Sequence, residues 1–207
     1  MNSRELKNQL RPFLTPMRFG GLPLHSLELK NAQIRDLPVI LKLEKEGFLP
    51  GIQEKEDVFI QRLKFFPQGF FLVYERNMIL GYINFEIWER KASWETYPFQ
   101  LNHLIAGVLN IHGPILYLAS MTISPLVRGK KVGTWLLRRG VERMIQDFPQ
   151  LEEVILVVNE QWKGAQKIYL SMGFRVLGKI EGFFTAEAMN TSAALVMRKP
   201  LNLPQWV

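Results

Sequence analysis

The segment from Leu116 to Thr134 holds the residues whose types and spacing fit the most definite chemistry, the binding of a phosphate. It consists of an apolar run, a turn at Ser124-Pro125, and a basic loop, Arg128 to Gly133, that leads into apolar residues at helical spacing. The start of a helix exposes unpaired backbone N–H groups and the positive end of the helix dipole. A strand, a loop and a helix in this order predict an anion site at the loop. The alternative is a basic turn before an ordinary helix.

The loop resembles the pyrophosphate-binding loop of the GNAT family of N-acetyltransferases, whose pattern is Gln or Arg, two residues, Gly, one residue, and Gly or Ala. Arg128 and Gly133 match the ends of this pattern, whereas Lys131 replaces the interior glycine. We expect that Lys131 holds a conformation that glycine reaches freely, or that the loop is reshaped. The resemblance implies that acetyl-CoA, as co-substrate, is held by backbone groups of the strand end and the loop. These residues are Met121, Thr122, Ile123, Arg128, Gly129, Lys130, Lys131, Val132, Gly133 and Thr134.

A second segment, Ala165 to Phe174, resembles the family's pattern A-x-x-[LI]-Y-x-x-x-G-F, and the resemblance covers about residues 24–200. It implies that Tyr169 protonates the sulfur of the leaving CoA. Tyr169 lies on the apolar face of its predicted helix, so its hydroxyl needs a partner inside the protein, and a core tyrosine bonded to a carbonyl is the alternative. Many members have Asn where this chain has Trp162. Asn159 is the candidate for the same contact with the pantetheine arm.

Attack of an amine on a thioester needs a group that takes up the proton of the amine. Glu86 is the first candidate, because it lies on the polar face of the predicted strand 79–88, beside Tyr82 and Trp88. That face is either solvated or a substrate wall. Burial among aromatic side chains would raise the pKa of Glu86 towards a useful range. The alternatives are Glu89, Glu95, His103, His112 and a water chain that ends at Ser120.

The acceptor is predicted to be a small primary amine with an apolar or aromatic part. The segments 44–50 and 66–71 faintly resemble the arylalkylamine and polyamine branch of the family, although Tyr117 and Ala119 stand where vertebrate arylalkylamine enzymes have histidines. A wall of aromatic residues would hold such an amine, with cation–π contacts. Its expected members are Phe48, Trp88, Trp94 and Phe183. A protein N-terminus or lysine is the second acceptor class, and an acyl-CoA-binding sensor without activity is a further alternative.

Composition limits the remaining classes of function. The net charge of +7 favours anionic partners, among them nucleic acid and CoA. The chain lacks the interleaved aromatic and basic motifs of RNA-binding domains, so we expect no nucleic-acid partner. With no cysteine and three scattered histidines, we also expect no metal site. No apolar run is long enough to span a membrane, and the N-terminus lacks the apolar core of a signal peptide. We therefore expect a cytoplasmic protein without a membrane partner. A monomer or a homodimer is expected.

The order of the predicted elements gives the fold class. Residues 1–23 read as an N-terminal arm, and residues 24–207 as one GNAT acetyltransferase domain of the α+β class. Three successive strands in the middle predict antiparallel pairing, and the strand–helix–strand order that follows predicts a parallel pair. The result is a mixed, mostly antiparallel central sheet with helices on both faces. The long connection 90–113, with a helix expected near 99–109, is either a lid over a site or a packed excursion.

Overall fold

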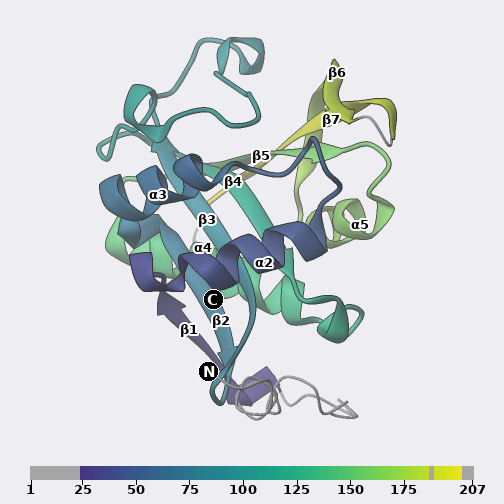
Figure 1. Cartoon of the computed structure of the whole chain (residues 1–207). Coiled ribbons are helices and arrows are strands. Elements are labelled where there is room, and N and C mark those ends of the chain that lie inside the picture. Colours follow the sequence, from purple (N-terminus) through teal and green to yellow (C-terminus); the bar gives the residue numbers. More distant parts are fainter. Residues whose placement is uncertain (1–23, 187–188, 202–207) are drawn as a thin grey trace.

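A seven-stranded mixed sheet, with the strand order β1-β2-β3-β4-β5-β7-β6, forms the centre of the molecule (Figure 1). The computed structural model describes residues 24–186 and 189–201, so the predicted arm lies outside the described residues. Neighbouring strands are antiparallel, except for the parallel pair of β4 and β5, which confirms the predicted fold class. The strands are β1 (Leu27–Asn31), β2 (Phe70–Glu75), β3 (Met78–Trp88), β4 (Ile115–Ile123), β5 (Glu153–Asn159), β6 (Arg175–Ala186) and β7 (Met189–Pro200).

Helices cover both faces of this sheet. In Figure 1, α2 and α3 lie in front of the sheet and α4 lies behind it. Helix α5 packs on the same side as α4, since Tyr169 belongs to the same buried cluster as Leu136 and Leu137. The helices are α2 (Leu37–Gly47), α3 (Glu56–Phe65), α4 (Val132–Asp147) and α5 (Lys163–Ser171). Short 3₁₀ turns are η1 (Leu24–Ser26), η2 (Ile34–Asp36), η3 (Pro67–Gly69), η4 (Trp94–Thr96), η5 (Ile105–Gly107) and η6 (Pro125–Val127).

The two faces of β3 differ, as its alternating sequence predicts. Ile83 and Phe85 face α4 in the main core, and α4 comes so close that a Cβ on Gly140 would lie 2.9 Å from the ring of Phe85. Tyr82 lies on the opposite face, within the apolar cluster under α2 and α3. Of the two alternatives for this second face, the solvated one is wrong, because Tyr82 and Glu86 are fully buried. Two helices cover the polar side chains of this face.

The long connection between β3 and β4 is a packed excursion, because several of its side chains enter the core. The helix expected near 99–109 is not formed, and the segment contains only the turns η4 and η5. Tyr97 and Phe99 pack against Trp88, with ring centroids 5.9 and 5.7 Å away, and Ile105 is fully buried. The excursion therefore gains its order from side chains that enter the core rather than from a regular helix.

Candidate active site

The parallel strands β4 and β5 separate before either of them ends. They pair from Ile115–Glu153 to Leu118–Leu156, but β4 continues to Ile123 and β5 to Asn159. The pairing of β3 with β4 shifts register here, since Asn84 is opposite Ser120 and Phe85 is opposite Leu118. The extra residue, Ala119, forms a β-bulge, which bends β4 away from its neighbour. Ala119, Ser120 and Met121 are accordingly part-exposed, whereas Ile115 to Leu118 are buried.

The gap between the two strands offers backbone hydrogen bonds to a ligand. Beyond Leu118, β4 is paired only with β3, and beyond Leu156, β5 is paired only with β7. The peptide groups that face each other across the gap belong to no ladder between these strands. Because backbone groups need partners, an extended molecule that carries amides, such as a pantetheine arm, fits between Met121 and the end of β5. The predicted contacts of Met121, Thr122 and Ile123 lie on this edge.

The basic loop lies directly beyond the open end of β4. After η6, Gly129 and Lys131 both have positive φ, 77° and 63°, and α4 begins at Val132. Lys131 therefore adopts the left-handed conformation that was expected if the loop kept its shape. The first helical residues, Val132 to Thr134, have no earlier turn whose carbonyls could accept their N–H groups. These N–H groups and the loop cations form the candidate pyrophosphate site.

Three elements converge at the helix start. A Cβ built on Gly133 would lie 3.7 Å from Cδ1 of Ile123 on β4 and 3.8 Å from Cδ1 of Ile168 on α5. Gly133 is buried at this junction. The two sequence motifs, which are separated by β5 in the chain, thus meet at the mouth of the gap.

Tyr169 follows Ile168 on α5 and is buried, with its ring 5.6 Å from that of Phe174. Among the described residues its hydroxyl makes no hydrogen bond that would shift its pKa, so the alternative of a core tyrosine bonded to a carbonyl does not apply there. Burial raises the pKa of Tyr169 above its ordinary value. A hydroxyl that stays protonated and lacks a protein partner is free to donate to a ligand.

Asn159 is fully buried at the end of β5, and its side chain has protein partners. Its Nδ2 donates to Ser192 Oγ at 2.7 Å, and its Oδ1 accepts from the Gln161 N–H at 2.8 Å. The side chain thus fixes the turn between β5 and α5. The Asn159 carbonyl also has partners, since it accepts from the Trp162 N–H at 3.0 Å and from Gln166 Nε2 at 2.9 Å. A contact of Asn159 with the pantetheine arm stays a prediction.

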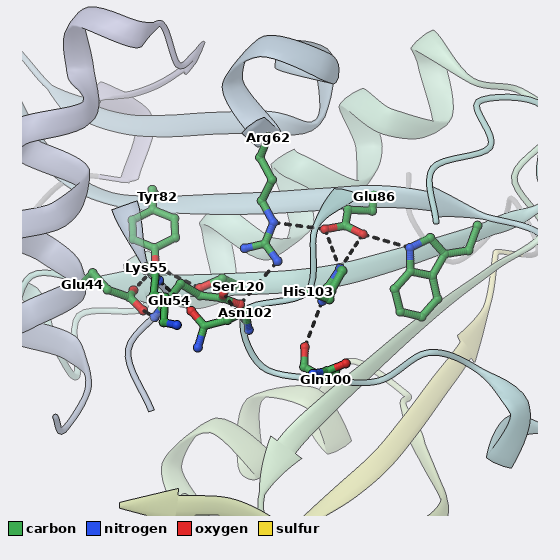
Figure 2. Close-up of polar contacts among 11 residues, drawn as sticks. Glu44, Glu54, Lys55, Arg62, Tyr82, Glu86, Gln100, Asn102, His103 and Ser120 are labelled. Carbon is green, nitrogen blue, oxygen red and sulfur yellow. Dashed lines mark hydrogen bonds and ion pairs between the residues drawn. The ribbon is translucent and has the colours of Figure 1, made fainter. Parts of the chain in front are cut away.

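Glu86 is the centre of a buried ion cluster (Figure 2). Its carboxylate accepts from Arg62 Nε at 3.0 Å, from Trp88 Nε1 at 2.9 Å, and faces His103 Nε2 at 2.8 Å. Burial alone would raise the pKa of Glu86, but the hydrogen bond from His103 and the charge of Arg62 outweigh it and hold the pKa below its ordinary value. The expected increase is therefore wrong. Burial among aromatic residues was foreseen, whereas the two cations from α3 and the 90–113 segment were not.

A second buried carboxylate, Glu44 on α2, was missed in the sequence. Its Oε1 accepts from the Glu54 N–H at 2.7 Å, and its Oε2 accepts a short hydrogen bond from the Tyr82 hydroxyl. The Tyr82 oxygen lies 2.8 Å from Ser120 Oγ. Burial raises the pKa of Glu44 to about 7, although the hydrogen bond from Tyr82 lowers it. The signal in the sequence is a glutamate at the helical spacing of the apolar stripe of α2, one position after Leu43 and four after Ile40.

Of the remaining candidates for the proton acceptor, three lie on the surface and two belong to the buried polar contacts. Glu89, Glu95 and His112 are exposed, whereas His103 is buried and bound to Glu86. Burial lowers the pKa of His103, but the hydrogen bond and charge of Glu86 dominate and raise it above its ordinary value. Ser120, at the end of the suggested water chain, is bonded to Tyr82.

The expected aromatic wall is divided between two clusters. Trp88 is buried and stacks on Tyr117 with a centroid distance of 3.9 Å, and Trp94 packs in the same cluster. Phe48 and Phe183 belong to a different cluster around Ile52 and Phe184. The correction follows from strand geometry, since Trp88 lies at the far end of β3, where the 90–113 segment covers it.

The cluster around Phe48 lies beside the ends of β4 and β5, since the neighbouring Gly47 meets Thr122 of β4 and Trp162 follows the end of β5. Phe48 follows α2 directly and its ring is 5.4 Å from that of Trp162, at the start of α5. Trp162 is in turn 5.4 Å from Phe184 on β6. The segment after α2, the start of α5 and β6 thus meet in one apolar cluster.

Comparison with known proteins agrees with this geometry. Residues 37–174 match the model of the acetyltransferase (GNAT) family. The chain belongs to this family. It therefore has the acyl-CoA N-acyltransferase fold. No curated protein matches the sequence.

Several solved structures share the fold. The loading GNATL domain of CurA from Lyngbya majuscula has a TM-score of 0.73 at 15% identity, covering 84% of this chain and 97% of that one. The GNAT-like decarboxylase GphF, in complex with isobutyryl-CoA, has a TM-score of 0.71 at 18% identity, with 84% and 98% covered. Arabidopsis thaliana Naa50, bound to the bisubstrate analogue CoA-Ac-MVNAL, has 0.61 at 17% identity, again with 84% and 98% covered. At these identities the likeness concerns the fold.

Two further properties of the described residues bear on the class of protein. Within residues 24–186 and 189–201, no helix is both long enough and apolar enough to cross a membrane. In the same part of the chain, no three His, Asp or Glu side chains are grouped so that they could hold a metal ion.

Proposed function

We propose that this chain transfers an acetyl group from acetyl-CoA to a primary amine by direct attack in a ternary complex. The observation that carries the proposal is the alignment of three features: the β4–β5 gap, the loop with the α4 N-terminus beyond it, and Tyr169 beside it. The gap suits the amides of pantetheine, and the helix start suits the pyrophosphate. Solved relatives of this fold with isobutyryl-CoA and with a CoA bisubstrate analogue support the same class of co-substrate.

The proposed roles follow from position. Backbone groups of Met121 to Ile123 hold the pantetheine arm, and those of Arg128 to Thr134 hold the diphosphate. Asn159, at the end of β5, is proposed to contact the arm from the other edge of the gap. The Tyr169 hydroxyl donates a proton to the leaving sulfur. Glu86 is proposed as a positioning residue rather than as the base, because its low pKa and its three donors keep it ionised and tied to Arg62 and His103.

The acceptor is proposed to be a small alkylamine or arylalkylamine, or a polyamine, that enters past Phe48 and Trp162. This finer choice rests on the apolar mouth and on the faint sequence resemblance. A protein amine is the second candidate, favoured by the peptide-like bisubstrate analogue bound to the Arabidopsis relative and by the fold shared with the ribosomal-protein-S18-alanine N-acetyltransferase from Escherichia coli. The solved relatives as a group do not single out the arylalkylamine and polyamine branch.

One experiment separates these possibilities. The full chain is incubated with acetyl-CoA and 2-phenylethylamine, spermidine, a peptide with a free N-terminus, or an N-blocked peptide that contains lysine. Release of free CoA is followed together with the mass of the acceptor. Acetylation of the first two supports the proposal, and acetylation of a peptide supports the second candidate. Tight binding of acetyl-CoA without transfer to any amine would indicate an acyl-CoA-binding sensor without activity. Absence of acetyl-CoA binding would refute the proposal.

A further inference from the structure

Three side chains joined by hydrogen bonds connect α2 to the gap between β4 and β5. Glu44 accepts from the Tyr82 hydroxyl, and the Tyr82 oxygen lies 2.8 Å from Ser120 Oγ. An ionised carboxylate only accepts, so Tyr82 donates to Glu44 and the Ser120 hydroxyl donates to Tyr82. The lone pairs of Ser120 Oγ are then left for a donor in the gap. Figure 2 shows these three residues on the other side of Arg62 from Glu86 and His103.

We propose that Glu44 is the final proton acceptor of the transfer reaction, and that Ser120 and Tyr82 relay the proton from the amine to it. The proposal deepens the proposed function and rests on it. The role of proton acceptor, predicted from the sequence for Glu86 on β3, thus falls to Glu44 on α2.

The location of the three residues supports this path. Ser120 is the part-exposed residue next to the bulge, on the strand segment that has left β5. The end of α2 lies directly on β4, because a Cβ on Gly47 would be 2.2 Å from Thr122 Oγ1. Phe48 then reaches across to Trp162. Glu44 thus lies one helical turn behind the residue that covers the mouth of the gap.

A further polar side chain beside Ser120 has unused hydrogen-bonding groups. Asn84 is directly opposite Ser120 in the β3–β4 pairing and lies between Tyr82 and Glu86 on the same face of β3. It is fully buried, and neither Oδ1 nor Nδ2 has a partner within the described part of the chain. Buried amides are seldom left unpaired. A polar group of the acceptor, or a water that it contacts, therefore fits next to Ser120.

The charges around Glu44 suit a proton acceptor. The titratable and charged groups that face it are Tyr82 from β3, Glu54 from the α2–α3 connection and Arg62 from α3. Burial, helped by the Glu54 charge, raises the pKa of Glu44 to about 7, so that near neutral pH it is ready both to take up and to release a proton. Burial and the Glu44 charge also raise the pKa of Tyr82 well above its ordinary value. A free phenolate is thus avoided, and the protons move together.

The proton and electron balance of the step is complete. The ammonium form of the acceptor gives a proton to Ser120 Oγ, while Ser120 gives its own to Tyr82 and Tyr82 gives its own to Glu44. Both hydroxyls are restored and the carboxyl is protonated. The amine nitrogen bonds to the acyl carbon, the carbon–sulfur bond breaks, and a second proton from nitrogen reaches sulfur through Tyr169. The products are the amide and the free thiol, and Glu44 returns its proton to solvent.

The test compares the pH dependence of kcat/KM in variants of the full chain, with acetyl-CoA and the best acceptor among 2-phenylethylamine, spermidine and the two peptides. For the wild type we expect kcat/KM to rise with pH through about 7. Glu44→Gln and Ser120→Ala should lose about 100-fold at pH 7. The loss should shrink as the pH approaches the pKa of the acceptor amine, about 8 for a peptide N-terminus and about 10 for an alkylamine, where the amine deprotonates on its own. Binding of acetyl-CoA, measured by calorimetry, should be unchanged in both.

Two matched glutamate variants make the test specific. Glu46→Gln, on the same helix but with its side chain 37% exposed beside Lys42, should keep the wild-type profile. Glu54→Gln should shift the rise to lower pH, because the charge of Glu54 raises the pKa of Glu44. A structural role of Glu44 would produce neither the recovery at high pH nor this shift.

Failure of the relay and failure of the transfer function give different results. A wild-type profile for Glu44→Gln, or equal losses for Glu44→Gln and Glu46→Gln, overturns the relay and leaves acyl transfer intact. If Glu44→Gln is poorly folded by circular dichroism, Ser120→Ala and the shift in Glu54→Gln decide in its place. A wild type that binds acetyl-CoA and acetylates none of the four acceptors overturns the relay together with the transfer function.

Discussion

At the scale of single residues, the pKa values of two buried glutamates on the same side of the sheet are shifted in opposite directions. Glu86 receives hydrogen bonds from Arg62, Trp88 and His103, which hold its pKa down. Glu44 faces a phenol, one backbone N–H and a second carboxylate, so burial dominates and its pKa rises to about 7. The partners that the fold supplies, and not burial itself, decide which carboxylate stays ionised.

The raised pKa of Glu44 predicts a stability that falls with pH. The pKa of Glu44 in the folded state lies above the ordinary value of a glutamate, so the contribution to stability is present at low pH and is lost as the pH rises towards and through about 7. Glu44→Gln removes this dependence. Relative to the wild type, the free energy of unfolding of the variant should gain about 2–3 kcal/mol between pH 5 and pH 8. Urea unfolding at both pH values measures it, and an equal difference at both would contradict the assignment.

Tyr169 predicts a loss of turnover without a loss of CoA binding. Burial alone shifts its pKa, so Tyr169→Phe removes no hydrogen bond among the described residues. We expect kcat to fall about tenfold or more, because a general acid is removed from the leaving sulfur, and the affinity for CoA to stay within a factor of two or so. Steady-state kinetics and calorimetry give the two numbers. Unchanged turnover would take Tyr169 out of the mechanism.

At the scale of elements, one extra residue in β4 creates the candidate site. The bulge at Ala119 separates β4 from β5, and the freed edge points at the loop before α4. In that loop Lys131 holds a left-handed conformation, which costs a residue with a Cβ about 1–2 kcal/mol. A conformation of this kind is kept where the surroundings require it, here to aim the first N–H groups of α4.

The loop predicts that a negative charge at the start of α4 weakens the binding of CoA. Gly133 can carry a Cβ in ordinary contact with Ile123 and Ile168, so the backbone tolerates a small side chain. Gly133→Asp should weaken CoA by at least about tenfold more than Gly133→Asn, which has the same shape without the charge, because the carboxylate repels the diphosphate. Calorimetric titration with CoA gives both affinities. Equal affinities would show that the diphosphate binds elsewhere.

The buried ion cluster between α3 and β3 predicts a large loss of stability when it is broken on one side. Arg62 is fully buried and bonds to Glu86 at 3.0 Å and to Glu54 at 3.3 Å. Arg62→Met leaves Glu86 buried with one cation fewer and should lower the free energy of unfolding by about 3–5 kcal/mol. The double variant Arg62→Met with Glu86→Gln should recover part of this loss, as urea unfolding can show. No recovery would mean that packing of Arg62, and not its charge, matters.

At the scale of the whole molecule, the surplus of positive charge and the single rigid sheet act together on an anionic co-substrate. The chain carries +7 overall, and the loop before α4 contributes three of its cations, Arg128, Lys130 and Lys131. A field of this sign draws CoA towards the gap and is screened by salt.

Acetyl-CoA is therefore predicted to stabilise the fold in a salt-dependent way. At 100 times its dissociation constant it should add about 2.7 kcal/mol to the free energy of unfolding, since it binds only the folded gap and loop. The dissociation constant should increase between low and high salt. Thermal unfolding with and without acetyl-CoA measures the first effect and calorimetry the second. Acetyl-pantetheine without the nucleotide is the control, and it should show little dependence on salt.

The sequence determined the parts of this protein that depend on neighbours in the chain. Apolar alternation predicted β3 and its two faces. The run 128–133 predicted a turn into a helix from Gly133, one residue after α4 begins, because backbone dihedrals and helix starts follow local residue types. The motif at 165–174 placed Tyr169 on the inner side of α5. The resemblance and the order of strands were enough for the fold class and for one end of the candidate site.

The tertiary structure decided which charges meet. His103 and Arg62 reach Glu86 from segments 17 and 24 residues away. Tyr82 meets Glu44 across 38 residues, and Ser120 meets Tyr82 across another 38. A pKa depends on these distant partners, so residue types in one strand could not show that Glu86 is held ionised and that Glu44 is not. The bulge at Ala119 likewise exists only in the pairing of β3 with β4, because a register shift belongs to two strands at once.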